Sequence, residues 1–242
     1  MNNCVAIISD IHANLPALQA VIAHIENQGI SERVCLGDVV GYGAQPMECI
    51  DLVRASGFQT ILGNHDASVA ADILPEGFSD LTAQSILWTR EALDAEHRAW
   101  LRSLPLTLCA GDFEAVHASL HHPLEWNYIL GADAAALHFK HQRKEICFIG
   151  HSHIPAMYME GQECALDLTS LESLRKGRKQ VVNVGSVGQP RDKNPDACYL
   201  IYRRAQADVW WRRVPYDIEA AQRAIAAAGL PGKHAHRLSL GK

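Results

Sequence analysis

The first 62 residues of the chain alternate between short apolar runs and segments with helical spacing. Residues 4–9, 33–36 and 58–62 are rich in apolar and β-branched side chains, which is typical of buried strands. Apolar residues recur every three or four positions over 15–25, and Pro46 opens a second helix that runs to about Ala55. This strand–helix–strand–helix–strand order predicts parallel strands joined by crossover helices.

The rest of the chain changes character. Residues 79–103 are expected to form two helices, which Ser79 or Asp80 and then Asp94 begin. A closing amphipathic helix is expected over 217–228. Between these helices the pattern predicts strands, several of them antiparallel, at 106–109, 113–118, 146–149, about 156–159, 179–184, 197–203 and 208–214.

These elements predict one α/β domain with two sheets over residues 1–230. Residues 231–242 are expected to form a flexible tail, in which His234 and His236 are an incidental pair. No stretch between the predicted elements is long enough to serve as a linker between two domains.

Composition narrows the class of protein. The chain has 242 residues and a net charge of −5, which argues against nucleic acid or an anionic membrane as a partner. Its seven cysteines are scattered and odd in number, as expected for reduced thiols in a cytoplasmic protein. No apolar run reaches the length of a transmembrane helix, and the first residues do not have the features of a signal peptide.

Polar side chains follow the predicted strands at the point where each strand ends. Ligand sites in open α/β sheets lie beyond the carboxyl ends of the strands, so these side chains are expected to meet at one edge. Imidazole and carboxylate groups together favour Mn, Fe, Ni or Zn over Ca or Mg. The residues are Asp10, His12, Asp38, Asn64, His65, His117, His151 and His153.

The spacing within two of these motifs is also informative. Asp10 and His12 are two positions apart, and so are His151 and His153. In an extended segment, such positions point to the same side, so each pair is expected to point into one site. Glycine precedes three of the ligand blocks, at positions 37, 63 and 150, where it permits tight turns and close backbone approach.

Taken together, these motifs resemble those of the calcineurin-like metallophosphoesterases. The resemblance covers roughly residues 4–190 and is nearest to a small prokaryotic branch, which has counterparts of the segments at 37–43 and 183–191. The motifs stand here in the family's order as Asp10-x-His12, Gly37-Asp38, Gly63-Asn64-His65-Asp66, His117 and Gly150-His151-x-His153.

The resemblance implies a two-sheet β-sandwich flanked by helices, with a dinuclear metal centre and manganese as the favoured ion. It implies that Asp10, His12, Asp38 and His153 hold one ion. Asp38 would also bridge to the second ion, which Asn64, His117 and His151 would complete. His65 would stand beside the ions as the catalytic residue that meets the phosphate, while Asp66 would cap the following helix.

Three further positions are expected to contact the substrate. Ser186, with the backbone around Gly185, and Arg191 are candidate phosphate contacts, and Tyr42 is a candidate for the substrate entrance. Two divalent ions beside Asp10 and Asp38 would leave the site with a net charge of about +2, which attracts a phosphate inside a protein that is itself negative.

The sequence leaves three hypotheses for function. The favoured one is a metal-dependent phosphohydrolase for a small-molecule phosphoester: a phosphodiester, a nucleotide or a dinucleoside polyphosphate. The alternatives are a nuclease of the same superfamily and a non-catalytic scaffold on the same fold. The motifs do not have the arginines that protein serine/threonine phosphatases carry there, which argues against phosphoproteins. His121 and His122 either contact substrate or are simply exposed, and self-association into a homo-oligomer is left open.

Overall fold

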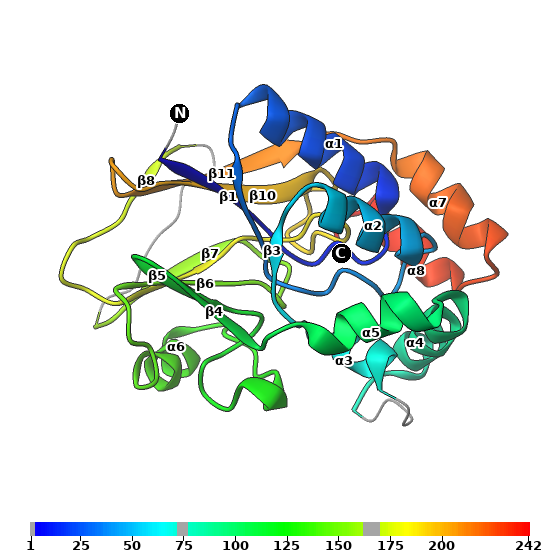
Figure 1. Ribbon diagram of the computed structural model, residues 1–242, viewed down its shortest axis with the longest axis horizontal. Helices are drawn as coiled ribbons and strands as arrows, with labels where there is room; N and C mark the ends of the chain where they lie inside the picture. Colours follow the sequence, from blue (N-terminus) through cyan, green and yellow to red (C-terminus); the bar gives the residue numbers. More distant parts are fainter. Residues whose placement is uncertain (1–2, 72–76, 162–169) are drawn as a thin grey trace.

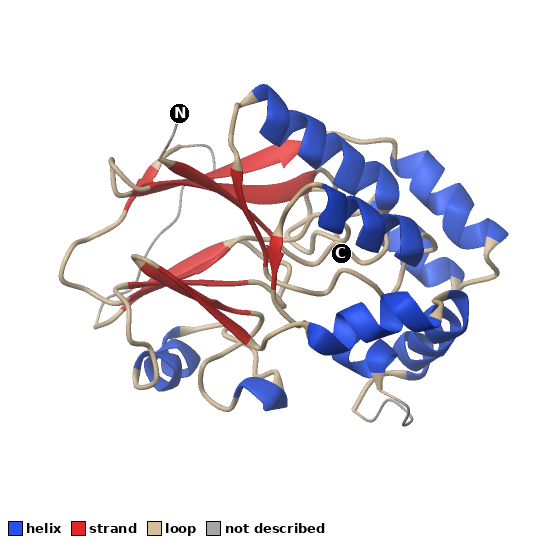
Figure 2. Ribbon diagram, viewed as in Figure 1, coloured by secondary structure: helices blue, strands red, loops and turns tan. Residues whose placement is uncertain are grey.

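Two mixed β-sheets lie face to face, and helices cover their outer faces (Figures 1 and 2). The computed structural model describes residues 3–71, 77–161 and 170–242. The first sheet has the order β3-β2-β1-β10-β11-β8. Its strands are β1 (Cys4–Ile8), β2 (Glu32–Cys35), β3 (Gln59–Thr60), β8 (Glu172–Ser173), β10 (Ala197–Arg203) and β11 (Asp208–Val214).

The second sheet has the order β4-β5-β6-β9-β7. Its strands are β4 (Thr107–Ala110), β5 (Phe113–Val116), β6 (Ile146–Ile149), β7 (Ala156–Met159) and β9 (Gln180–Asn183). In the first sheet β1 pairs in parallel with β2, and β2 with β3. In the second sheet β6 pairs in parallel with β5 and β9. The expected two-sheet sandwich is therefore confirmed.

Several of the helices begin where a local side chain accepts one of their first backbone amides. Asn14, Ser79 and Asp94 each accept a hydrogen bond from a backbone N–H in the first turn of the helix that follows. The helices are α1 (Leu15–Asn27), α2 (Pro46–Ala55), α3 (Asn64–Ala70), α4 (Asp80–Ala92), α5 (Ala95–Ser103), α6 (Ala132–Phe139), α7 (Ile218–Ala227) and α8 (Gly232–Leu238), with a 3₁₀ turn at Pro123–Glu125.

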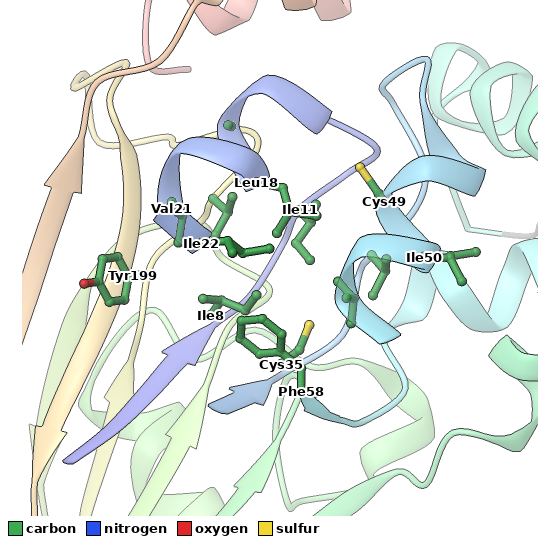
Figure 3. Packing of buried hydrophobic residues seen from close by; sticks show 14 of the residues in the cluster. Ile8, Ile11, Leu18, Val21, Ile22, Cys35, Cys49, Ile50, Phe58 and Tyr199 are labelled. Carbon is green, nitrogen blue, oxygen red and sulfur yellow. The ribbon is translucent and has the colours of Figure 1, made fainter. Parts of the chain in front are cut away.

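Strand β1 shows how the layers form. Val5 and Ile7 pack into the core between the two sheets, together with Phe113 and Phe148 of the second sheet. Ile8, on the opposite face, packs with the side chains of α1 and α2 (Figure 3). This alternation follows from the two-residue period of a strand. A third cluster joins the outer face of the second sheet to α6, so each sheet is buried on both faces.

The prediction that residues 231–242 form a flexible tail is wrong. Residues 232–238 form helix α8, which packs beside α7. His234 and Leu238 are buried at 3% exposure, and the His234 ring lies 4.9 Å from the ring of Tyr42. The short segment was misread because its buried side chains find their partners elsewhere in the chain, and no local apolar pattern reveals those contacts.

Two smaller differences concern other segments. The third strand was expected over 58–62 but is reduced to Gln59–Thr60. Cys164, which is predicted to be a reduced thiol, lies outside the described residues.

Among the residues that the structure describes, no helix has the length and apolar content needed to cross a membrane.

Candidate metal centre

The predicted ligand residues meet at the edge where parallel strands from both sheets end. Asp10 follows β1, Asp38 follows β2, His117 follows β5 and His151 follows β6. The potential ligand atoms form three overlapping groups, each with its atoms within 4.8 Å of one another. The groups are Asp10–His12–His153, Asp38–His117–His151 and His12–Asp38–His65, and every member is buried.

Asn64 joins the second of these groups. Its side-chain oxygen lies 3.1 Å from Nε2 of His117, and the same Nε2 lies 3.3 Å from a carboxylate oxygen of Asp38. On the other side, Nε2 of His12 and Nε2 of His153 are 3.0 Å apart. All seven residues that the sequence singles out as metal ligands therefore belong to one cluster.

Backbone carbonyls orient three of the imidazoles. The Nδ1 atoms of His12, His117 and His153 lie 3.2, 2.7 and 2.6 Å from the carbonyl oxygens of Val40, Leu36 and Gln189. A carbonyl can only accept, so each Nδ1 carries the proton and each Nε2 faces the cluster. Metal-binding histidines in proteins are commonly held in this way.

The backbone that carries these ligands is not extended, contrary to expectation. Asp10, His12, Asp38, His151 and His153 all have positive φ, between 49° and 67°. The left-handed conformation costs roughly 1–2 kcal/mol for a residue other than glycine. All of these side chains still reach the cluster: His151 groups with Asp38 and His117, and His153 groups with Asp10 and His12.

Two of the predicted glycines are required by close packing. A Cβ at Gly63 would collide with the backbone nitrogen and side chain of Asp38. A Cβ at Gly150 would collide with Ser9 and with the carboxylate of Asp10. Glycine at these positions lets one ligand loop lie directly against the next, which brings the ends of both sheets together.

Burial and mutual charge set the protonation of the cluster. Burial favours the neutral acid at Asp38, but the charge of His117 and its other histidine neighbours holds the pKa of that carboxyl well below its usual range. Burial also opposes charge on His117, yet Asp38 and Asp10 raise the His117 pKa to about 9. Burial raises the pKa of Asp10 to about 7. In the metal-free protein, a proton on His117 thus supplies the positive charge beside Asp38.

The donor set fits divalent transition-metal ions. Nε2 of His151 is buried and has no hydrogen-bond partner, although an unpaired buried polar atom is costly. Imidazole nitrogens and carboxylate oxygens at neighbouring positions are the ligands that such ions prefer. The unpaired nitrogen and the converging Nε2 atoms are what a metal-binding site requires.

His65 lies beside this cluster on the first turn of α3. The helix begins at Asn64, three residues before the start expected from Asp66 as its N-cap, and Gly63 is the N-cap. Asp66 still caps the helix from its first turn, because it accepts the backbone N–H of Gly63 at 3.2 Å, and it also accepts that of Val40 at 3.1 Å, which ties this turn to the Asp38 loop. The backbone N–H of His65 donates to Asp38 at 2.8 Å.

The His65 ring is buried among aromatic neighbours. It lies 4.5 Å from the ring of Tyr42 and 4.8 Å from that of His12. Burial lowers the His65 pKa to about 4, against the opposing effect of Asp38 and with a further lowering by Arg191. Its Nδ1 is buried without a hydrogen-bond partner. His65 is therefore a neutral imidazole at neutral pH, with one ring N–H available to donate.

A cavity of about 180 Å³ opens over the cluster. Tyr42 and Arg191, both predicted, line it, and the Arg191 guanidinium lies 5.9 Å from the Tyr42 ring centre. Nε of Arg191 is buried without a hydrogen-bond partner. Tyr128 also lines the cavity and stacks on His151 at 4.0 Å, a contact that sequence reasoning missed because nothing around position 128 marks it.

Ser186 is not brought to the cavity. It is fully buried, its hydroxyl donates to the carbonyl of Asp10 at 2.9 Å, and it accepts the backbone N–H of Gln189 at 2.8 Å. The backbone N–H of Gly185 donates a hydrogen bond to the side-chain oxygen of Asn183 at 2.9 Å. The Ser186 hydroxyl therefore fixes the Asp10 loop, and the phosphate contact expected from the backbone amides around Ser186 stays a prediction.

The fold and this cluster can be compared with those of known proteins. Residues 4–205 match the Calcineurin-like phosphoesterase superfamily domain. The chain therefore belongs to the calcineurin-like phosphoesterase superfamily, and it is a phosphoric ester hydrolase. The family is metal-dependent, in agreement with the groups of ligand residues described above.

Several relatives cover different shares of the chain. A crystal structure of a metallophosphoesterase from Sphaerobacter thermophilus is 35% identical, covers all of both chains and has a TM-score of 0.89. An uncharacterized protein of Methanocaldococcus jannaschii is 37% identical over the whole of both chains. A symmetrical bis(5'-nucleosyl)-tetraphosphatase of Methylococcus capsulatus is 32% identical over 50% of this chain and 44% of its own length.

Proposed function

We propose that the protein hydrolyses a small-molecule phosphoester at a pair of divalent transition-metal ions, with manganese as the favoured ion. The observation that carries this proposal is the buried cluster of seven ligand residues at the base of a cavity that Arg191 lines. The net charge of −5 argues against nucleic acid as a substrate, since the chain as a whole carries no excess of positive charge.

The ligand groups divide naturally between two ions. Asp10, His12 and His153 would hold one, and Asn64, His117 and His151 the other. Asp38 faces both sets, because one of its oxygens lies 3.7 Å from Nε2 of His12 and 3.3 Å from Nε2 of His117. It is therefore the proposed bridge.

Two side chains, Arg191 and His65, would act on the substrate beside the ions. When bound, the ions supply a nucleophile from water at neutral pH and neutralise charge on the phosphoryl oxygens. Arg191 offers an unpaired Nε–H to a phosphoryl oxygen. His65 donates its ring N–H to the phosphate or to the leaving oxygen, and Tyr42 and Tyr128 pack against the groups beside it.

Dinucleoside polyphosphates are the first substrates to test, because relatives of half the chain are named as symmetrical bis(5'-nucleosyl)-tetraphosphatases. Metal-replete protein should hydrolyse at least one of p-nitrophenyl phosphate, bis(p-nitrophenyl) phosphate and diadenosine tetraphosphate. A chelator should abolish the activity, and Mn²⁺ should restore it. Activity that survives complete metal removal would contradict the proposal, and hydrolysis of single-stranded DNA alone would favour a nuclease.

Metal binding is expected to release protons, with a pH dependence that follows from two pKa values. The His117 pKa of about 9 and the Asp10 pKa of about 7 both lie above or near neutral pH, so a metal ion must displace their protons. The apparent affinity for metal should therefore rise with pH. Metal binding should release about one proton per chain between pH 7 and 9, and about two below pH 7.

Calorimetric titration of metal-stripped protein in buffers of different ionisation enthalpy measures the protons released. His117→Ala should lower the number by about one across this range. A proton release that is unchanged by this substitution would show that His117 is not the group displaced.

A further inference from the structure

A second group of histidines lies outside the candidate metal centre, on the surface beside α6. The segment that joins β5 to α6 carries His121 and His122, and His141 follows the end of α6. Nδ1 of His121 is 3.1 Å from Nε2 of His141. The His122 ring centre is 4.3 Å from that of His121 and 6.5 Å from that of His141.

From these residues we propose a third metal site, for one Zn²⁺ or a similar borderline transition-metal ion, formed by His121, His122 and His141. Two nitrogens bound to one tetrahedral Zn²⁺ at about 2.0–2.1 Å lie about 3.3 Å apart. The His121–His141 pair already approaches that separation, as the His12–His153 pair does in the main centre. The proposal does not depend on the proposed function.

The backbone directs the adjacent pair to one side. Neighbouring residues of an extended chain point in opposite directions, which would separate the rings of His121 and His122. His122 has a φ of 51°, and this left-handed conformation turns its ring beside that of His121. The adjacent rings can therefore face the same ion.

Hydrogen bonds already order the segment that carries these rings. The backbone N–H of His121 donates to Ser119 at 3.1 Å, and the backbone N–H of Glu125 donates to the carbonyl of His122 at 2.9 Å. The backbone N–H of His141 donates to the carbonyl of His138 at 3.0 Å. The backbone of the ligand segment is therefore ordered before an ion binds, which favours affinity, while the His122 ring must turn to bring a nitrogen to the ion.

The charged groups near His121 favour its neutral form, which is the form that binds a metal ion. Partial desolvation and the nearby His122 and His141 lower the pKa of His121, and Lys140 adds to that effect. The charge of Glu125 acts to raise the pKa of His121, and the Glu125 carboxylate accepts a hydrogen bond from the side-chain amide of Asn127 at 3.0 Å. Three imidazoles with one carboxylate nearby are ligands that Zn²⁺ prefers, whereas Mn²⁺ binds such sites more weakly.

The site would hold the segment that packs on the main centre. Downstream of His122, the ring of Trp126 lies 5.9 Å from that of His117, and Tyr128 stacks on His151. An ion shared by His122 and His141 would join this segment to the end of α6. Zn²⁺ should therefore raise the melting temperature of the protein through this site.

The test compares Zn²⁺ binding in four proteins already loaded with Mn²⁺. These are the wild type, His121→Ala, His141→Gln and the control His236→Ala, which removes another exposed histidine on α8. Equilibrium dialysis and elemental analysis should find one more Zn²⁺ in the wild type and the control than in the two site variants. Any Zn²⁺ that replaces Mn²⁺ in the main centre should be the same in all four proteins, so it does not affect the difference in Zn²⁺ content between them.

The remaining affinity of the site variants for this ion should be lower by more than about tenfold. The rise in melting temperature on adding Zn²⁺ should also be smaller in both site variants than in the control. Equal Zn²⁺ content in all four proteins would overturn the proposal, as would an extra equivalent that survives in both site variants. Either result leaves the main centre untouched, because its Mn²⁺ content and activity are measured separately.

Discussion

Replacing Asp38 with Asn is expected to empty both positions of the main metal centre and to lower kcat/KM by at least about 10²–10³-fold, the loss typical when one preorganised electrostatic contact is removed. Asp38 is the carboxylate that faces both His12 and His117. The change removes one of two negative charges that hold the ions, while the amide keeps the shape of the side chain. Elemental analysis beside steady-state kinetics measures both effects.

His12→Ala is the matched control for Asp38→Asn. His12 groups with Asp10 and His153, away from the His117 side, so its loss should weaken one ion and spare most of the other. Asp38→Asn should also lower the His117 pKa, because that imidazole loses the first of the charges that raise it. Full metal content with a near-normal rate in Asp38→Asn would refute the bridging role.

Replacing His65 with Asn should keep both ions and lower kcat by about 10²–10⁴-fold, the usual contribution of a positioned proton donor. His65 is held beside the centre by its backbone hydrogen bond to Asp38, which the variant retains. Because burial keeps the ring neutral, the expected role is donation of a ring N–H. The loss should be larger for substrates with a poor alkoxide leaving group than for p-nitrophenolate.

Asn64→Ala provides the contrast, since Asn64 is adjacent in sequence but faces His117. It should lower occupancy of one ion, with activity partly restored by excess Mn²⁺. Metal loss in His65→Asn would make His65 a ligand, in line with its place in the group with His12 and Asp38. Equal rate losses on both substrates would remove the leaving-group role and leave stabilisation of the phosphoryl oxygens.

Local patterns predicted most of the fold because each element carries its own signal. The strand at Ile146–Ile149 and the helix from Pro46 to Ala55 were placed at their observed bounds. Helix α8 was missed, since its buried side chains contact Tyr42 and the end of α7 rather than one another. The spacing of apolar residues indicates a buried face of a long helix or strand, but it does not reveal a short helix whose contacts are with residues distant in sequence.

The sequence by itself determined which residues form the main cluster, because ligand-type side chains at strand ends and the glycines before them are local features. Only the tertiary structure decided the backbone and the neighbours of these residues. His151 and His153 both adopt left-handed backbone, and His151 groups with Asp38 and His117 while His153 groups with Asp10 and His12. Ser186 turns inward to the Asp10 loop, and Tyr128 comes to the cavity by stacking on His151. These outcomes depend on contacts between segments far apart in the chain, which no local pattern encodes.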